Sequence, residues 1–133
     1  MEMRVYSGGG KKVVADYEGF TTETDQSVKN GGEGAAPEPF GLFLASLGAC
    51  AGHYVYSFCE KRNIPIDDIT LTQKVDRDKK TKMIERVCID IALPEDFPEK
   101  YVNGVVKSAA LCTVKKQLNP SIAFEITTRT VAG

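Results

Sequence analysis

Residues 37–62 read PEPFGLFLASLGACAGHYVYSFCEKR, and this segment carries the strongest structural signal of the sequence. Pro37 and Pro39 suit a helix entrance, and no proline interrupts the segment from Phe40 to Arg62. At about 100° per residue, one face of a helix here would collect the apolar side chains of Phe43, Leu47, Cys50, Tyr54 and Phe58. The segment therefore predicts a long helix that ends at Asn63-Ile64-Pro65.

This helix differs from an ordinary surface helix in its remaining faces. The apolar arc is widened by Phe40, Leu44, Ala51 and Val55, and much of the rest is occupied by small residues, namely Gly41, Ala45, Ser46, Gly48, Ala49 and Gly52. Small side chains let another backbone approach closely, so we expect a central helix that is packed on several sides. Cys59 falls off the apolar stripe, near the polar end of the helix.

The segments around this helix alternate between strand and helix patterns. Before it, β-branched and aromatic residues predict strands at Val5-Tyr6, 13–17 and 20–24, with a tight turn at Glu18-Gly19 and a loop over 29–34. After it come strands at 69–76 and 84–93, joined by the charged hairpin loop 78–82. A second helix follows, capped by Asp96, then a short helix over 111–118 and a strand over 122–128. This order predicts an α+β fold with antiparallel pairing.

Length and charge narrow the function classes. A chain of 133 residues with 42% hydrophobic residues fits a single domain spanning residues 1–133. Basic and acidic residues nearly balance, at 17 and 18, which argues against a nucleic-acid partner. The N-terminus lacks a signal-peptide pattern, and no apolar run approaches the ~20 residues that a membrane span needs. We therefore expect a cytoplasmic protein with no membrane partner.

Four cysteines are the candidates for chemistry, and none forms a CxxC pair, so neither a zinc ribbon nor a thioredoxin motif is indicated. Cys50 lies on the apolar stripe, where a cysteine commonly packs as a small hydrophobe. Cys112 follows a helix and opens a short one, where unpaired N–H groups and the helix dipole favour a thiolate. Lys115 and Lys116 could add positive potential there. The alternative is that Cys112 packs inertly at a helix junction.

The other polar candidates carry weaker signals. We expect no chemical role for Cys59 or Cys88, and strand alternation places Cys88 on the more exposed face. His53 lies one helical turn from Cys50, but no second pair of ligands stands at metal spacing, so no metal site is predicted. There is no G-x-S-x-G motif, no P-loop and no dinucleotide fingerprint, so no cofactor is predicted either.

Two segments resemble a known family. PFGLFLASLGAC, residues 39–50, resembles the OsmC/Ohr segment that starts with proline and ends with two small residues and cysteine. AALCTVKKQL, residues 109–118, resembles the second cysteine segment of that family. The order of elements agrees as well, so the resemblance covers most of the chain. It implies an OsmC-like fold, in which antiparallel sheets wrap around long central helices in an intertwined homodimer.

The resemblance also implies a reaction, that of a thiol-dependent peroxidase in oxidative-stress defence. Cys50 would be the thiolate that attacks the O–O bond of an organic hydroperoxide, and Cys112 would resolve its sulfenic acid to a disulfide. A dithiol reductant, lipoyl-type in this family, would reopen that disulfide. A disulfide needs Cα atoms within about 7 Å, so the fold must bring the two cysteine segments together.

The sequence departs from the family peroxidases at three places. Phe40 and Gly41 stand where a glutamate is frequent, and Glu38 lies on the other side of the motif proline. The family peroxidases activate the thiolate with an arginine from the N-terminal region, but here Arg4 is the only arginine before Cys50, with Lys11 and Lys12 as the other basic candidates. Thr113 stands after the second cysteine, where proline is usual. These departures place the chain with the OsmC-like branch. They leave open a non-enzymatic dimer that responds to redox state or binds a small molecule, and a structural dimer with inert cysteines.

Overall fold

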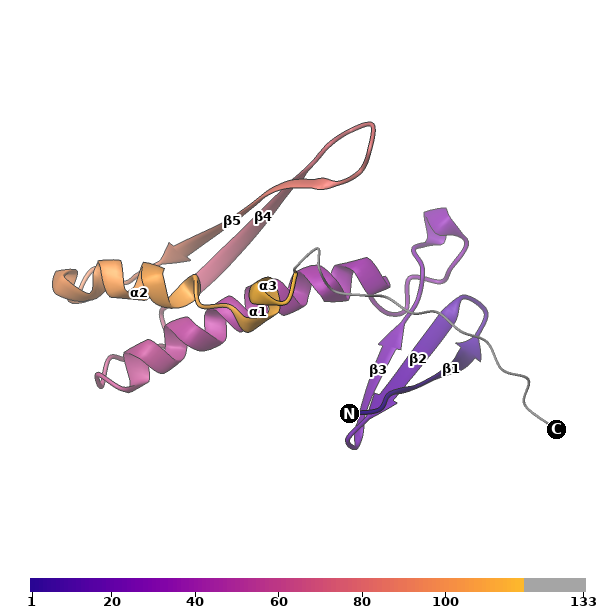
Figure 1. Ribbon diagram of the computed structural model, residues 1–133, viewed down its shortest axis with the longest axis horizontal. Coiled ribbons are helices and arrows are strands. Elements are labelled where there is room, and N and C mark those ends of the chain that lie inside the picture. The colour runs from indigo at the N-terminus through magenta and orange to yellow at the C-terminus, as the bar shows by residue number, and fades with distance from the viewer. Residues whose placement is uncertain (119–133) are drawn as a thin grey trace. The chain divides into compact units, whose positions relative to one another are not determined.

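The computed structural model describes residues 1–118, so the predicted strand over 122–128 lies outside the described residues. The chain divides into two compact units, one made of residues 1–49 and 71–90 and the other of residues 50–70 and 91–133. One long helix contributes residues to both units (Figure 1).

The first unit contains an antiparallel sheet with the strand order β1-β2-β3 (Figure 1). Its strands are β1 (Arg4–Gly9), β2 (Lys12–Tyr17) and β3 (Phe20–Thr24). Glu18 and Gly19 both have positive φ, 46° and 83°, which a two-residue hairpin turn requires, so the predicted turn is confirmed. Val14 is the buried residue of these strands, whereas Val5 and Phe20 are 63% and 64% exposed. The sheet therefore leaves large apolar side chains uncovered within this chain.

The loop between β3 and the long helix is organised by a buried carboxylate. Asp25 is 1% exposed and accepts the backbone N–H groups of Gln26, Glu33 and Ala35 at 2.8, 3.3 and 3.1 Å. These donors lower the pKa of Asp25. The glycine-rich segment that was predicted as a loop is therefore held in one conformation, which includes the short 3-10 helix η1 (Val28–Asn30).

The long helix α1 (Pro39–Glu60) lies within two residues of its predicted bounds. Its burial pattern corrects the predicted stripe, because the buried apolar side chains of the helix follow one another at four-residue spacing: Leu47, Ala51, Val55 and Cys59. Cys59 was expected off the apolar stripe, and that expectation was wrong. Small residues such as Ala51 and Gly52 let neighbouring segments approach closely, so they are buried, whereas the large aromatic side chains of α1 are at least partly exposed.

By length and composition alone, α1 would be able to cross a membrane, with a mean hydropathy of 1.3 in its most apolar window. The expectation that no apolar segment has this length was therefore too strict. The core helices of soluble proteins share these two properties, so they are weak evidence for a membrane span.

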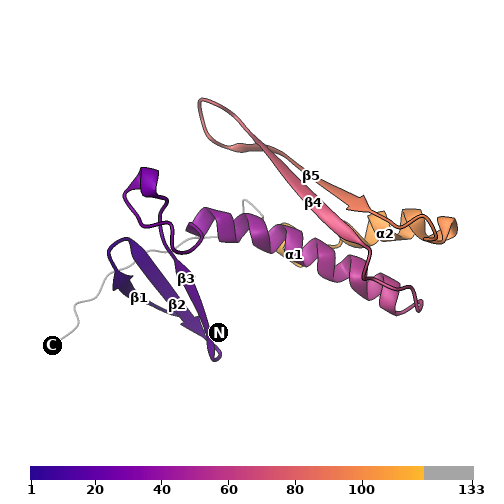
Figure 2. The same cartoon turned by 180° about the vertical axis from the view of Figure 1, so that it is seen from behind.

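A hairpin follows α1, made of β4 (Thr70–Arg77) and β5 (Ile84–Ala92) (Figure 2). In the turn of this hairpin, the Asp78 carboxylate accepts hydrogen bonds from the backbone N–H groups of Lys80 and Thr81, at 2.9 and 2.6 Å. The predicted charged hairpin loop is therefore confirmed. Cys88 on β5 is exposed, as strand alternation predicted.

In the second unit, the predicted second helix begins later than expected. A 3-10 turn, η2 (Glu99–Tyr101), leads into α2 (Val102–Ala109), with Pro98 and not Asp96 at the N-cap of that turn. Gly104 of α2 packs on the ring of Phe58 in α1 so closely that an added Cβ would lie 2.5 Å from Cζ of that ring. The chain then turns into α3 (Thr113–Lys116), which completes an α+β fold with antiparallel sheets and a long helix, as predicted.

Candidate active site

The structure brings Cys50 and Cys112 together within the second compact unit. Cys50 is half-buried on α1, and Cys112 is 4% exposed and is the N-cap residue of α3. A hydrogen bond from the side chain of Cys112 is among the interactions that lower the pKa of the Cys50 thiol. None of the four cysteines forms a disulfide in the structure. Two thiols that are distant in the sequence therefore share one local environment.

Hydrogen-bond donors lower the pKa of the Cys50 thiol below its ordinary value. The backbone N–H of Val114 has the largest effect, and partial burial opposes it. The side chain of Cys112 and the backbone and hydroxyl of Thr113 then lower the pKa further. A thiolate that accepts several hydrogen bonds is favoured over the thiol, so the site stabilises the ionised form of Cys50.

The donors come from the start of α3 for a simple reason. The first N–H groups of a helix have no acceptor within the helix, and Thr113 and Val114 are the first two residues of α3. The next N–H group, that of Lys115, points to Sγ of Cys112 at 3.4 Å. The sequence predicted that these donors would serve Cys112, and the structure divides them between the two sulfurs. The side chains of Lys115 and Lys116 are exposed.

Tyr54 extends this network from α1. It stands one helical turn after Cys50, and its hydroxyl lies 2.7 Å from Oγ1 of Thr113. From the sequence, Tyr54 was expected only on the apolar face of the helix, and no chemical role was predicted for Val114. Thr113 was noted only because proline is usual at its position in the family. The four-residue spacing between Cys50 and Tyr54 was a signal that could have identified the tyrosine.

Three of the charged residues compared with the family's activating residues, Arg4, Lys12 and Glu38, have other partners within the first unit. The guanidinium of Arg4 lies over the ring of Tyr6, 5.0 Å from its centroid. Lys12 forms an ion pair with Glu33 at 2.8 Å. Glu38 accepts hydrogen bonds from the backbone N–H of Ser27 and the side-chain amide of Asn30, at 3.1 and 3.0 Å. Each candidate therefore already stabilises local structure.

The remaining candidates stand apart from the thiol pair. Burial raises the pKa of Cys59, which favours its protonated form. His53 is exposed, and its ring meets that of Tyr54 edge-on, with centroids 5.4 Å apart. Over residues 1–118 no three His, Cys, Asp or Glu residues form a group that could hold a metal ion.

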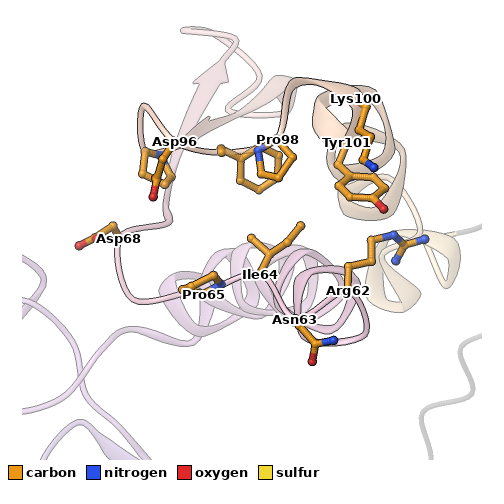
Figure 3. Close-up of a pocket in the computed structure, with 11 residues that line it drawn as sticks. Arg62, Asn63, Ile64, Pro65, Asp68, Asp96, Pro98, Lys100 and Tyr101 are labelled. Atoms are coloured by element: carbon orange, nitrogen blue, oxygen red, sulfur yellow. The ribbon is translucent and has the colours of Figure 1, made fainter.

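A cavity of about 530 Å³ lies elsewhere in the second unit, where the end of α1 faces the segment that enters η2 (Figure 3). Ile64, Pro65 and Pro98 lie across its middle, with Asp68 and Asp96 at one end and Arg62, Lys100 and Tyr101 at the other (Figure 3). No cysteine lines this cavity.

Comparisons with known proteins agree with this architecture. A family model described as OsmC-like protein matches residues 31–127. A search of the curated proteins finds no match. The similar solved structures include a proposed osmotic stress induced and detoxification response protein from Psychrobacter arcticus, at 22% identity and TM-score 0.74, with 89% of this chain and 88% of that chain covered.

Two further solved structures are similar over nearly the same length. A hypothetical protein from Aquifex aeolicus is 24% identical with a TM-score of 0.70, and 90% of this chain and 87% of that chain are covered. An organic hydroperoxide resistance protein, OsmC, from Legionella pneumophila is 18% identical with a TM-score of 0.56, at 90% and 88% coverage. At these identities the likeness shows a shared fold.

Proposed function

Because the chain belongs to the OsmC-like protein family, we propose that it is a thiol-dependent peroxidase that reduces organic hydroperoxides through Cys50 and Cys112. The observation that carries this proposal is the environment of the Cys50 thiol. Hydrogen bonds from the start of α3 and from the side chain of Cys112 lower its pKa. A stabilised thiolate next to a second thiol is the arrangement that a two-cysteine peroxidase needs.

The proposed reaction has three steps. The Cys50 thiolate attacks one oxygen of the peroxide, the O–O bond breaks, and the alkoxide leaves and takes a proton to become an alcohol. Cys50 is then a sulfenic acid, and attack by Cys112 on its sulfur forms the disulfide and releases water. A dithiol reductant, lipoyl-type by family resemblance, exchanges with the disulfide and restores both thiols.

Exposure supports this division of roles between the two cysteines. Cys50 is the less buried of the two, which suits the residue that meets the incoming peroxide, whereas Cys112 is 4% exposed. A buried neighbour suits a resolving residue, since it needs to meet only the sulfenic acid of Cys50. Solved proteins of similar fold that are named for organic hydroperoxide resistance guide the choice of substrate class.

We propose that residues 1–133 act as one OsmC-like domain in a homodimer. Helix α1 contributes to both compact units, which favours a single domain. The β1–β3 sheet leaves Val5, Val13 and Phe20 between 45% and 64% exposed, and a second chain would cover apolar surface of this kind. A cytoplasmic location suits a cycle that depends on reduced thiols. Sedimentation of a monomer at micromolar concentration would argue against the dimer.

A second candidate is a non-enzymatic dimer that responds to redox state through the same two cysteines. The observation that favours it is that Arg4, Lys12 and Glu38, the nearest counterparts of the family's activating residues, are engaged with Tyr6, Glu33 and the η1 loop respectively. In this case the thiol pair would oxidise slowly and would not turn over peroxide.

Rapid mixing of the reduced protein with cumene hydroperoxide separates the two candidates. The peroxidase predicts fast loss of two thiols per chain, which Cys50→Ser abolishes. In Cys112→Ser the sulfenic acid of Cys50 persists and is trapped by dimedone. Cys88→Ser is the matched control, because it removes an exposed thiol outside the pair and should change nothing. Thiols that survive prolonged exposure would exclude the peroxidase.

A further inference from the structure

The contact between Tyr54 and Thr113 links α1 to the donors at the start of α3. The two hydroxyl oxygens are 2.7 Å apart, a short distance for a hydrogen bond between hydroxyl groups. Tyr54 is half-buried on α1, and Thr113 is exposed. Both residues belong to the same compact unit as Cys50, so the whole chain of contacts lies within one unit.

The direction of this hydrogen bond follows from counting protons. The hydroxyl of Thr113 has one proton and two lone pairs. A hydrogen bond from its side chain is also among the interactions that lower the pKa of Cys50, and a thiolate can only accept. When Cys50 is ionised, Thr113 must therefore give its proton to the sulfur. Its oxygen is then left to accept from Tyr54, so the order is Tyr54 O–H to Thr113 Oγ1, and Thr113 O–H to Cys50 Sγ.

We propose that Tyr54 is a positioning residue, whose hydroxyl holds the Thr113 hydroxyl in the orientation that donates to Cys50 Sγ. A threonine hydroxyl rotates to suit its partners, and one on the protein surface also meets water. A donor fixed on the Thr113 oxygen removes that freedom and polarises the second hydrogen bond. The spacing of one helical turn on α1 gives Tyr54 and Cys50 the same side of the helix.

This inference rests on the proposed role of Cys50, but it can be measured without peroxide. The test is the pH profile of Cys50 alkylation by iodoacetamide, since only the thiolate reacts. Peptide mass spectrometry follows Cys50 and Cys112 separately, because Cys112 is the titratable side chain in contact with Cys50. Tyr54→Phe should move the Cys50 midpoint to higher pH. Below that midpoint, the rate should fall roughly two- to tenfold, the effect of one hydrogen bond.

The chain offers a matched control on the same helix. The Tyr56 hydroxyl donates to the backbone carbonyl of Ile69 at 3.0 Å and takes no part in the contacts of Cys50. Tyr56→Phe therefore removes an equal group and should leave the midpoint of Cys50 unchanged. An equal shift in both variants would overturn the proposal, because it would report general loosening of α1.

A double-mutant cycle tests whether Tyr54 acts through Thr113. In a Thr113→Val protein, Tyr54→Phe should have no further effect on the midpoint, whereas in Thr113→Ser, which keeps a hydroxyl, its effect should persist. Full additivity, or a Tyr54→Phe protein that titrates like the parent, would refute the inference. Failure of the proposed peroxidase is distinguishable, since it would abolish turnover while the alkylation midpoints still respond to Tyr54→Phe.

Discussion

Replacing Val114 with proline removes one N–H group from the surroundings of the Cys50 sulfur. That N–H is the donor with the largest effect on the pKa of Cys50. The helix does not need it, because the first backbone bond of α3 runs from Lys116 N–H to the Cys112 carbonyl at 3.2 Å. Proline is tolerated in the first turn of a helix for this reason.

The magnitude follows from the strength of a charge-assisted hydrogen bond. A bond to a charged acceptor is worth about 1.5–3 kcal/mol. Cys50 is only half-buried, so solvent weakens the effect, and we take about 1–1.4 kcal/mol. This corresponds to a roughly five- to tenfold loss of thiolate at any pH below the midpoint. Because the lost donor favoured the ionised form, the midpoint of Cys50 moves to higher pH.

Iodoacetamide alkylation of Cys50 at a series of pH values measures this loss directly. Val114→Ala is the control, since it shortens the side chain but keeps the N–H, and its rates should stay within about twofold of the parent. A proline disfavours helical backbone at the preceding Thr113, so circular dichroism and thermal melting accompany the measurement. If folded Val114→Pro is alkylated like Val114→Ala at every pH, the account of the thiolate is wrong.

Three further predictions concern the rest of the chain. In native protein, mass spectrometry should find alkylation at exposed Cys88 but not at Cys59, which is 0% exposed and whose pKa is raised by burial. Alkylation of Cys59 in place of Cys88 would contradict this prediction. In urea unfolding, Gly104→Ala should lower the free energy of unfolding by about 1–2 kcal/mol, because its Cβ would meet an aromatic ring at 2.5 Å. Gly41→Ala, whose Cβ would have its nearest neighbour at 4.0 Å, should not lower it. Asp25→Asn should destabilise the protein at neutral pH; since the pKa of Asp25 is lowered, this difference should begin to shrink as pH falls below about 4 and disappear only below the lowered pKa. A difference that stays constant with pH would contradict it.

Local patterns in the sequence predicted most elements of the fold. Helix α1 was predictable because two prolines mark its start and an uninterrupted helical period follows. The hairpin turn at Glu18-Gly19 was predictable because its backbone needs positive φ at both positions. The start of the second helix was predicted incorrectly at Asp96, because a 3-10 turn precedes that helix. Residue propensity alone does not distinguish the first turn of an α-helix from a 3-10 turn.

The site was predictable only as far as its two cysteines. Motif resemblance singled out Cys50 and Cys112, but no pattern in the sequence says which sulfur receives the N–H groups at the start of α3. That depends on how α3 docks against α1, a tertiary contact between segments far apart in the chain. Burial along α1 likewise depends on tertiary contacts that the sequence pattern does not show, and the stripe that contains Cys59 is more deeply buried than the stripe that contains Cys50.

Peptide mapping after treatment with one equivalent of cumene hydroperoxide identifies the residue that oxidised Cys50 joins. We expect one dominant cross-link, a disulfide that joins the peptide containing Cys50 to the peptide containing Cys112, with Cys59 and Cys88 still reduced. A dominant disulfide that involves Cys88, or oxidation of Cys50 without any bond to Cys112, would contradict it.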